Sequence, residues 1–224
     1  MGKIRRGGYI FVTWKGDHSP RHVHVYRDGV LVVKWDLDHR SPMAGEGHAK
    51  ASGIDRRVGT REAFMRIQSV THNNRKKAFQ VKASKKTYNF PYSKVDPQPT
   101  LDDPIVRLEV DKELGREGFT YMLESGKEGT VHSEQVLEYN QDPHYLRDVL
   151  LYKLTIESQK RVKASALSKR EMIRRLGTSA TQFYRLLDQT NYRKSVDQLL
   201  SLLHVLDCDV DLLVRTKTTS GKAA

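Results

Sequence analysis

Two histidines near the N-terminus, His22 and His24, stand two positions apart among alternating apolar residues. Successive side chains of a strand point to opposite faces, so this spacing places both imidazoles on one face. Paired imidazoles can share a metal ion or transfer protons at a phosphodiester, with Asp17 or His18 nearby to orient them. The spacing predicts a catalytic set of His22, His24 and Asp17, with no assigned metal or cofactor. The alternative is an exposed polar strand face.

Several strand-like runs position these histidines. The residues alternate over 9–14, 22–26 and 30–35, and Asp28-Gly29 between two apolar runs predicts a tight hairpin. Arg21 and Lys34 are placed to hold a phosphate. Residues 39–60 are rich in Gly, Ser, Pro and charge, and we expect a loop there with at most one short helix near Ile54.

The segment from Tyr9 to Asp38, with its His-x-His strand, resembles a short bacterial domain of unknown function found in toxin–antitoxin-like gene pairs. The resemblance implies a toxin-like protein partner. In that family an Arg-Arg-Val-like start leads into a leucine-rich helix, whereas here 56–58 is followed by Gly59-Thr60 and no such helix develops. A new strand pattern then begins at Met65, so we expect a toxin-like domain, incomplete at its end, joined to its antitoxin-like regulator.

The middle of the chain predicts a small antiparallel β-domain. Its five expected strands cover 65–70, 78–81, 87–90, 105–110 and 118–123, with turns at Asn73-Asn74, Gly115 and Ser125-Gly126. Its titratable residues are scattered and mixed in sign, so we expect a scaffolding or partner-binding role.

The last third of the chain predicts helices. After Asp142-Pro143, an N-cap followed by Pro, the apolar period becomes 3.6 and we expect helical structure as far as Val210. Capping boxes begin at Ser168, Ser179 and Ser195, and Gly177 can end the first of these helices in a left-handed conformation. Two short helices joined by a glycine turn form the unit whose second helix enters a major groove. A helical bundle with a solvated basic face is the alternative. On the helix expected after Pro143, one apolar stripe should contain Leu146, Val149, Leu150, Leu154 and Ile156.

The order of motifs from Ser168 to Leu187, followed by a leucine-rich helix and residues 209–214, resembles the Cro/cI-type (Xre family) helix-turn-helix, including its antitoxin members. The resemblance covers about a third of the chain and implies a first helix over 168–176 and a recognition helix over about 179–188. It implies that Gln182 bridges adenine N6 and N7 and that Arg185 forms a fork with guanine or binds phosphate. The full set implied to contact DNA is Thr178, Ser179, Ala180, Thr181, Gln182, Tyr184, Arg185, Asn191, Tyr192, Arg193 and Lys194.

Members of this family commonly bind palindromes as dimers. The leucine-rich helix has apolar residues on more than one face, and one stripe can meet a second subunit or belong to the core. These residues are Leu199, Leu200, Leu202, Leu203, Val205 and Leu206.

Composition bounds the function. The net charge is +12, with the excess at the two ends of the chain, which favours a polyanionic partner. Cys208 is the only cysteine, so the sequence predicts no internal disulfide and suits a reducing cytoplasm. No apolar run approaches the roughly 20 residues that cross a bilayer, and we expect no membrane partner.

We therefore expect an α+β protein with domains over 1–58, 65–140 and 142–215. Its expected function is sequence-specific binding of double-stranded DNA, as a dimeric transcriptional regulator and antitoxin-type autorepressor, cytoplasmic and nucleoid-associated, fused to a toxin-like domain. One alternative is a nuclease or RNA-cleaving toxin that uses the His-x-His strand. Another is a basic protein that binds DNA without sequence preference.

Overall fold

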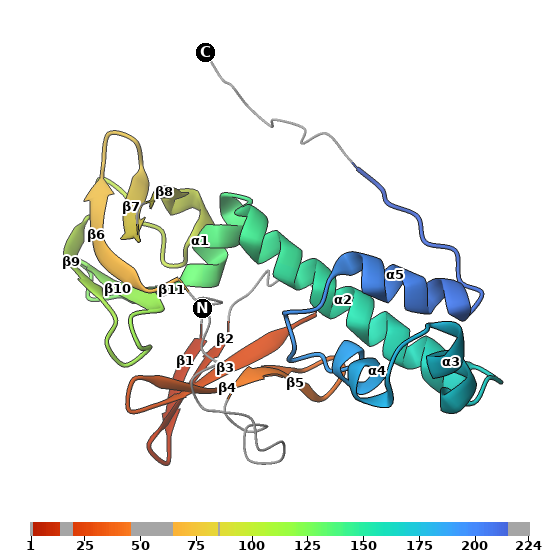
Figure 1. Ribbon diagram of the computed structural model, residues 1–224. Helices are drawn as coiled ribbons and strands as arrows, with labels where there is room; N and C mark the ends of the chain where they lie inside the picture. Colours follow the sequence, from red (N-terminus) through yellow and green to blue (C-terminus); the bar gives the residue numbers. More distant parts are fainter. Residues whose placement is uncertain (1, 14–19, 46–64, 85, 215–224) are drawn as a thin grey trace. The chain divides into compact units, whose positions relative to one another are not determined.

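The computed structural model describes residues 2–13, 20–45, 65–84 and 86–214, and it has a mixed α+β fold (Figure 1). The chain divides into two compact units, residues 1–150 and 151–224. The domains expected over 1–58 and 65–140 both fall in the first unit. Within the described ranges, no helix combines the length and apolar character needed to span a membrane.

The first sheet of the first unit is an antiparallel meander in which each strand pairs with the next. Its strands are β1 (Gly2–Arg6), β2 (Tyr9–Thr13), β3 (His22–Arg27), β4 (Val30–Asp36) and β5 (Ser41–Gly45). The expectation of a loop throughout 39–60 is wrong at its start, because β5 pairs with β4 there. Pro42 argues against a strand in the sequence. An edge strand tolerates a proline, however, because one side of its backbone forms no hydrogen bonds within the sheet.

The β3–β4 hairpin has the expected two-residue turn. Asp28 and Gly29 both have positive φ, 52° and 72°, as a type I′ turn requires. This turn lies against residues 112–115, and a side chain at Gly115 would collide with the carbonyl group of Gly29. The N-terminal sheet and the middle of the chain therefore approach each other backbone to backbone at this point.

Two three-stranded antiparallel sheets form the middle of the chain. They consist of β6 (Ile67–Asn73), β7 (Ala78–Ala83) and β8 (Lys86–Pro91), and of β9 (Ile105–Val110), β10 (Gly118–Leu123) and β11 (Glu128–His132). The five expected strands are present, whereas β11 and the following helix α1 (Ser133–Tyr139) were not expected. The two sheets and α1 share one core of Ile67, Phe79, Val81, Phe90, Tyr92, Phe119, Tyr121, Leu123, Val131 and Val136.

The N-terminal sheet obtains part of its apolar cover from the middle of the chain. Ile10, Val12 and Tyr26 form a buried cluster with Leu114, which follows β9. The segment after Val58, where the sequence predicts that no leucine-rich helix develops, lies outside the described residues. Contacts with a distant segment thus supply apolar burial that this short sheet needs to offset its chain entropy.

Helices make up the second unit. They are α2 (Pro143–Ala164), α3 (Lys169–Arg175), α4 (Ala180–Leu186) and α5 (Val196–Val205). The first eight residues of α2 belong to the first unit. Their core contains Leu151, Val162, Met172, Phe183, Leu186, Leu199 and Leu202. The expectation of helical structure to Val210 is wrong for the last residues, because α5 ends at Val205.

The apolar stripe expected on α2 is also wrong in part. Leu146 and Leu150 are exposed, whereas Thr155 and Ser158 are buried. Polar residues can occupy the buried face because the Thr155 hydroxyl donates to the Leu151 carbonyl at 2.6 Å and the Ser158 hydroxyl to the Leu154 carbonyl at 2.8 Å. The period of leucines therefore predicted the buried face only in part, since Ile156 is buried and Leu154 packs against the core.

Candidate functional site

The β3–β4 hairpin carries a row of polar side chains on one buried face. His22 lies opposite Asp36 and His24 opposite Lys34 across the two strands, and all four side chains are buried. His22 and His24 therefore share a face, as their spacing predicts. The alternative of an exposed polar face is wrong, since the exposed fractions of these histidines are 2% and 0%.

Glu134, the second residue of α1, supplies the partner for this row. Its carboxylate oxygens lie 3.2 Å from His22 Nε2 and 3.2 Å from His24 Nε2. Lys34 Nζ donates to both oxygens, at 2.8 and 2.7 Å. We call His22, His24, Lys34 and Glu134 the Glu134 cluster.

Hydrogen bonds and burial define the electrostatics of the cluster. His22 Nδ1 lies 3.0 Å from the carbonyl oxygen of Pro20 and its Nε2 lies 3.2 Å from a Glu134 carboxylate oxygen, so both ring nitrogens face acceptors. Burial lowers the pKa of His24 to about 4, so this ring is neutral and donates through Nε2. Burial alone would raise the pKa of Glu134, but Lys34 and His24 outweigh it and hold the pKa well below its usual value.

A second set of polar groups, Tyr26, Glu117 and His132, adjoins the cluster. The Tyr26 hydroxyl donates to Glu117 at 2.7 Å and lies 2.8 Å from His132 Nε2. His132 Nδ1 accepts a hydrogen bond from the Glu134 backbone N–H at 3.3 Å, so its proton is on Nε2 and points at Tyr26. The His132 and His24 rings lie 4.2 Å apart between centroids. Burial raises the pKa of Glu117 to about 7.

Three residues of the cluster have the spacing of metal ligands. One ligand atom each from His22, His24 and Glu134 lies within 4.8 Å of the others. Their surroundings do not fit a cation, however, because the Lys34 ammonium donates to both carboxylate oxygens and would lie against the ion. The groups around the two oxygens are all donors, which is the arrangement that suits an anion.

The other residues expected near the histidines have different outcomes. Asp17 and His18 lie outside the described residues. The Arg21 guanidinium pairs with Asp38, at 2.9 Å. Lys34 was expected to bind a phosphate, and in the structure it binds the carboxylate of Glu134.

Sequence reasoning missed the acidic half of this site. Glu117, His132 and Glu134 lie in the region predicted to be a scaffold, and 112 positions separate Glu134 from His22. The only local signal is the sequence His132-Ser133-Glu134 at the end of a strand, where buried polar residues are unusual. No strand or helix period connects it to the histidines.

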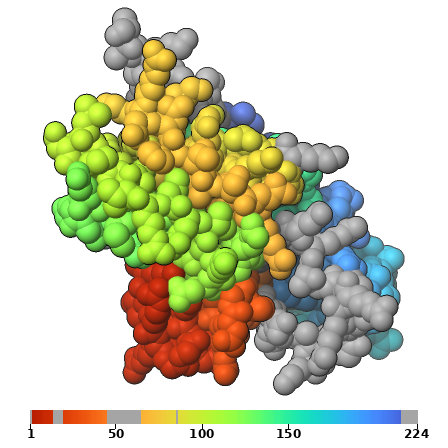
Figure 2. Space-filling view, turned by 90° about the vertical axis from the view of Figure 1, so that its left-hand side faces the viewer, coloured from red at the N-terminus to blue at the C-terminus, as the bar shows by residue number. Residues whose placement is uncertain are grey.

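Acidic residues of the middle region also bind the basic N-terminus. Lys3 Nζ lies 2.6 Å from Asp111 and 2.7 Å from Glu113, and Arg5 lies 2.6 Å from Glu113. Arg5 and Lys3 lower the pKa of Glu113 to about 2. Figure 2 shows the described N-terminal residues lying against residues from the middle of the chain. Part of the positive charge expected to attract a polyanion is therefore neutralised within the chain.

The second set of predicted residues lies on and around α4. Gly177 has a φ of +61° at the end of α3, and the Ser179 hydroxyl accepts a hydrogen bond from the Gln182 N–H at 3.2 Å, which caps α4. Phe183 is fully buried in the core of the second unit. The residues of α4 that are exposed include Ala180, Thr181, Gln182, Tyr184 and Arg185.

A cation from α3 lies beside this exposed face. Lys169 Nζ is 5.5 Å from the centroid of the Tyr184 ring, a cation–π contact. Two further cations of α3, Arg174 and Arg175, pair with Glu171 and lower its pKa to about 2. Lys169 is thus an α3 cation that lies next to α4.

The residues after α4 divide between the surface and the interior. Arg193 is exposed, and Thr178 and Tyr192 are half-buried. The Asn191 amide donates to the Arg185 carbonyl at 3.0 Å and so caps the end of α4. Lys194 is buried, its ammonium donates to the carbonyls of Leu186 and Asp188 at 2.9 and 2.6 Å, and burial lowers its pKa to about 8.

Lys194 therefore stabilises the loop after α4 and does not fit the phosphate contact expected of it. Its ammonium links the carbonyl at the end of α4 to the carbonyl of Asp188 in the loop that follows. We leave Lys194 out of the DNA-contacting set proposed below.

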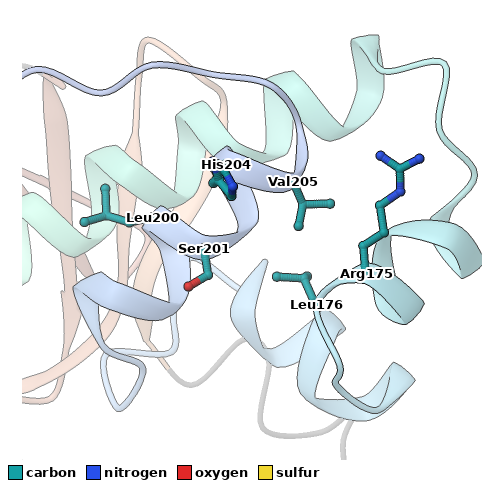
Figure 3. Close-up of a pocket in the computed structure, with 6 residues that line it drawn as sticks. All are labelled: Arg175, Leu176, Leu200, Ser201, His204 and Val205. Atoms are coloured by element: carbon teal, nitrogen blue, oxygen red, sulfur yellow. The ribbon is translucent and has the colours of Figure 1, made fainter.

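The leucine-rich helix α5 has a buried face and an outer face. Leu199, Leu202 and Leu203 are buried in the core, whereas Leu200 is 38% exposed. Figure 3 shows a shallow hollow between the end of α3 and the outer face of α5, lined by Arg175, Leu176, Leu200, Ser201, His204 and Val205. The predicted dimer stays a prediction, and the outer face around Leu200 is the part of α5 available for it.

Comparisons with protein-family models, with curated proteins and with solved structures found no match to this chain. The resemblances drawn from the motifs therefore stay predictions. The function is argued below from the geometry of the two sites.

Proposed function

We propose that the protein is a sequence-specific DNA-binding transcriptional regulator in which α3, the Gly177 turn and α4 act as a helix-turn-helix unit. The observation that carries this proposal is the two-sided character of α4. Phe183 and Leu186 anchor the helix in the core, while Thr181, Gln182 and Arg185 stay exposed. A rigid helix with an exposed polar face is what base readout in a major groove needs.

The side chains on this face have distinct proposed roles. Gln182 offers the amide donor and acceptor that pair with adenine, and Arg185 offers the guanidinium fork that pairs with guanine. Arg193 and Lys169 lie outside the helix and bind phosphates, which fixes the register of α4 in the groove. Tyr184 holds Lys169 beside the helix through its ring.

We further propose that the regulator is an antitoxin-type autorepressor joined to a toxin-like N-terminal domain, and that it acts as a dimer in the cytoplasm. The support is the way in which the middle region binds the N-terminal sheet. Asp111 and Glu113 pair with the basic first strand, and Glu134 binds the histidines and Lys34. This arrangement is the one expected when an antitoxin-like region covers a toxin-like surface.

Selection of bound duplexes from a random DNA pool tests the proposal. We expect the wild-type protein to enrich one motif with two related half-sites. Gln182→Ala and Arg185→Ala should each relax base preference at one position per half-site, at a cost of about 1–3 kcal/mol in discrimination. Arg107→Ala, which removes an exposed cation from β9, is the matched control and should keep the wild-type motif. Equal affinity for all duplexes would contradict the proposal and favour a basic binder without sequence preference.

The second candidate function is cleavage of a phosphodiester by His22 and His24. It is favoured by the convergence of two imidazoles and one ammonium on a single pair of oxygens. Purified protein should then cleave RNA or DNA, and His22→Ala combined with His24→Ala should abolish the activity. Absence of cleavage, by the wild type and by variants lacking the Glu134 carboxylate alike, would remove this candidate.

A further inference from the structure

We propose that His22, His24 and Lys34 form a binding site for a phosphate-type oxyanion, and that the carboxylate of Glu134 occupies this site within the same chain. The proposal concerns the first unit and does not depend on DNA binding by α4. It assigns a ligand class to the N-terminal sheet and a role to Glu134.

The contacts match those of an oxyanion site. Two oxygens of Glu134 receive four nitrogen contacts, two from Lys34 at 2.7 and 2.8 Å and one from each histidine at 3.2 Å. Charged N–H donors around paired oxygens are the usual surroundings of a bound phosphate or carboxylate. Two adjacent oxygens of a phosphate can therefore accept the hydrogen bonds that Glu134 now accepts.

The charges also favour a phosphate. The Lys34 ammonium lies 2.7 Å from the Glu134 carboxylate, and the two imidazoles place a ring nitrogen beside each carboxylate oxygen. A phosphate anion would meet the same ammonium and the same ring nitrogens. A divalent metal ion would instead add positive charge next to the Lys34 ammonium.

The site and its occupant come from different parts of the chain. All three donors belong to the β3–β4 hairpin, where His24 and Lys34 are direct cross-strand partners. The occupant comes from α1, 100 positions after Lys34 in the sequence. The hairpin alone therefore positions the three donors. Another oxyanion can replace the Glu134 carboxylate without moving them.

Anion rescue of the full chain tests this assignment. Trp14 and Trp35 are the two tryptophans of the sequence and both fall within residues 1–150, so their fluorescence reports on the first unit. We expect Glu134→Ala to lower the unfolding midpoint of this unit by roughly 5–15 °C, because Lys34 is left buried without its counterion. Inorganic phosphate should then restore about half of the loss in a saturable manner, compared with chloride at equal ionic strength.

Two controls separate a site from the general effect of phosphate on protein stability. The wild type and Glu138→Ala, the same change further along α1, should respond to phosphate with a small, non-saturating shift. Glu134→Ala combined with Lys34→Met should lose the saturable response. A response in Glu134→Ala no larger than in the wild type, or one that survives Lys34→Met, would overturn the proposal.

Two further measurements cover other outcomes. If Glu134→Ala unfolds in chloride, refolding in phosphate should recover the native tryptophan emission, and equal failure in both salts contradicts the proposal. Titration of the wild type with Zn²⁺ or Mn²⁺ should not raise the midpoint. Stabilisation by either ion that is lost in His22→Ala would overturn the oxyanion assignment, because the cluster would then be a metal site.

Discussion

The β3–β4 hairpin and helix α4 carry similar polar side chains in opposite surroundings. On the hairpin, His22, His24 and Lys34 are buried around the carboxylate of Glu134. On α4, Gln182 and Arg185 remain exposed. Both segments were expected to contact nucleic acid from their residue types and spacing. The difference teaches that local spacing predicts which polar residues share a face, whereas contacts from distant segments decide whether that face is available to a partner.

On the buried face of the hairpin, the ion pair between Lys34 and Glu134 gives the largest expected effect on stability. Lys34→Met alone should reduce the free energy of unfolding of the first unit by about 3–5 kcal/mol, since it leaves Glu134 with a buried charge facing only the histidines. Adding Glu134→Leu should recover a large part of this loss. Denaturant titration followed by tryptophan fluorescence measures both. Costs that simply add would show that the two residues do not act as a pair.

Two neighbouring residues of α4 test whether this helix has one buried face and one exposed face. Phe183→Ala should cost about 3–5 kcal/mol, because the ring is fully buried and its loss leaves a cavity in the core of the second unit. Tyr184→Ala, one position further on, should change stability by less than about 1 kcal/mol, since the ring is 55% exposed and contributes mainly its contact with Lys169. Circular dichroism at 222 nm during denaturation follows the helices. Similar losses of stability in the two variants would contradict a helix with Phe183 on its buried face and Tyr184 on its exposed face.

Glu117 makes the stability of the first unit depend on pH. Burial raises its pKa from 4.5 to about 7, so the folded state keeps a proton that the unfolded state releases at lower pH. The resulting stability is fully present below pH 4.5 and is lost as the pH rises through 7, a change of the order of 3 kcal/mol. Glu117→Gln should flatten this part of the profile, whereas Glu128→Gln, at an exposed site, should not. An unchanged profile in Glu117→Gln would contradict the role of burial.

Capping of α4 gives the smallest expected effect. Ser179→Ala removes the acceptor of the Gln182 N–H and should cost the second unit about 1 kcal/mol. Ser179→Asp keeps an acceptor at the cap and should restore most of that stability. The measurement is the denaturation midpoint by circular dichroism. Equal midpoints for Ser179→Ala and the wild type would show that the cap does not stabilise α4.

Residues with local signals were predicted well. Asp28-Gly29 identified the hairpin, and Ser168, Ser179 and Gly177 marked the ends of α3 and α4, because caps and left-handed turns depend on a few neighbouring residues. The shared face of His22 and His24 followed from the geometry of a strand. These features need no knowledge of the rest of the chain.

Residues whose surroundings come from afar were not predicted. Glu134 reaches His22 across 112 positions, and no period in the sequence joins them. Lys194 has the residue type of a surface cation but is buried, and it donates to the carbonyls of Leu186 at the end of α4 and of Asp188 in the following loop. The buried face of α2 was predicted only in part, because the buried hydroxyls of Thr155 and Ser158 donate to carbonyls within the helix and a pattern of hydrophobic residues does not reveal this.

The salt dependence of DNA affinity tests the central claim most directly. Fluorescence anisotropy of a labelled duplex from the selected pool should show wild-type affinity falling by about 10²–10³-fold between 50 and 200 mM salt, with a shallower slope for Arg193→Ala. At either salt concentration the selected duplex should bind far more tightly than a scrambled one, and Arg185→Ala should reduce that ratio. Affinity that is equal for both duplexes, or unaffected by Arg185→Ala, would contradict the account of α4 as an open recognition helix.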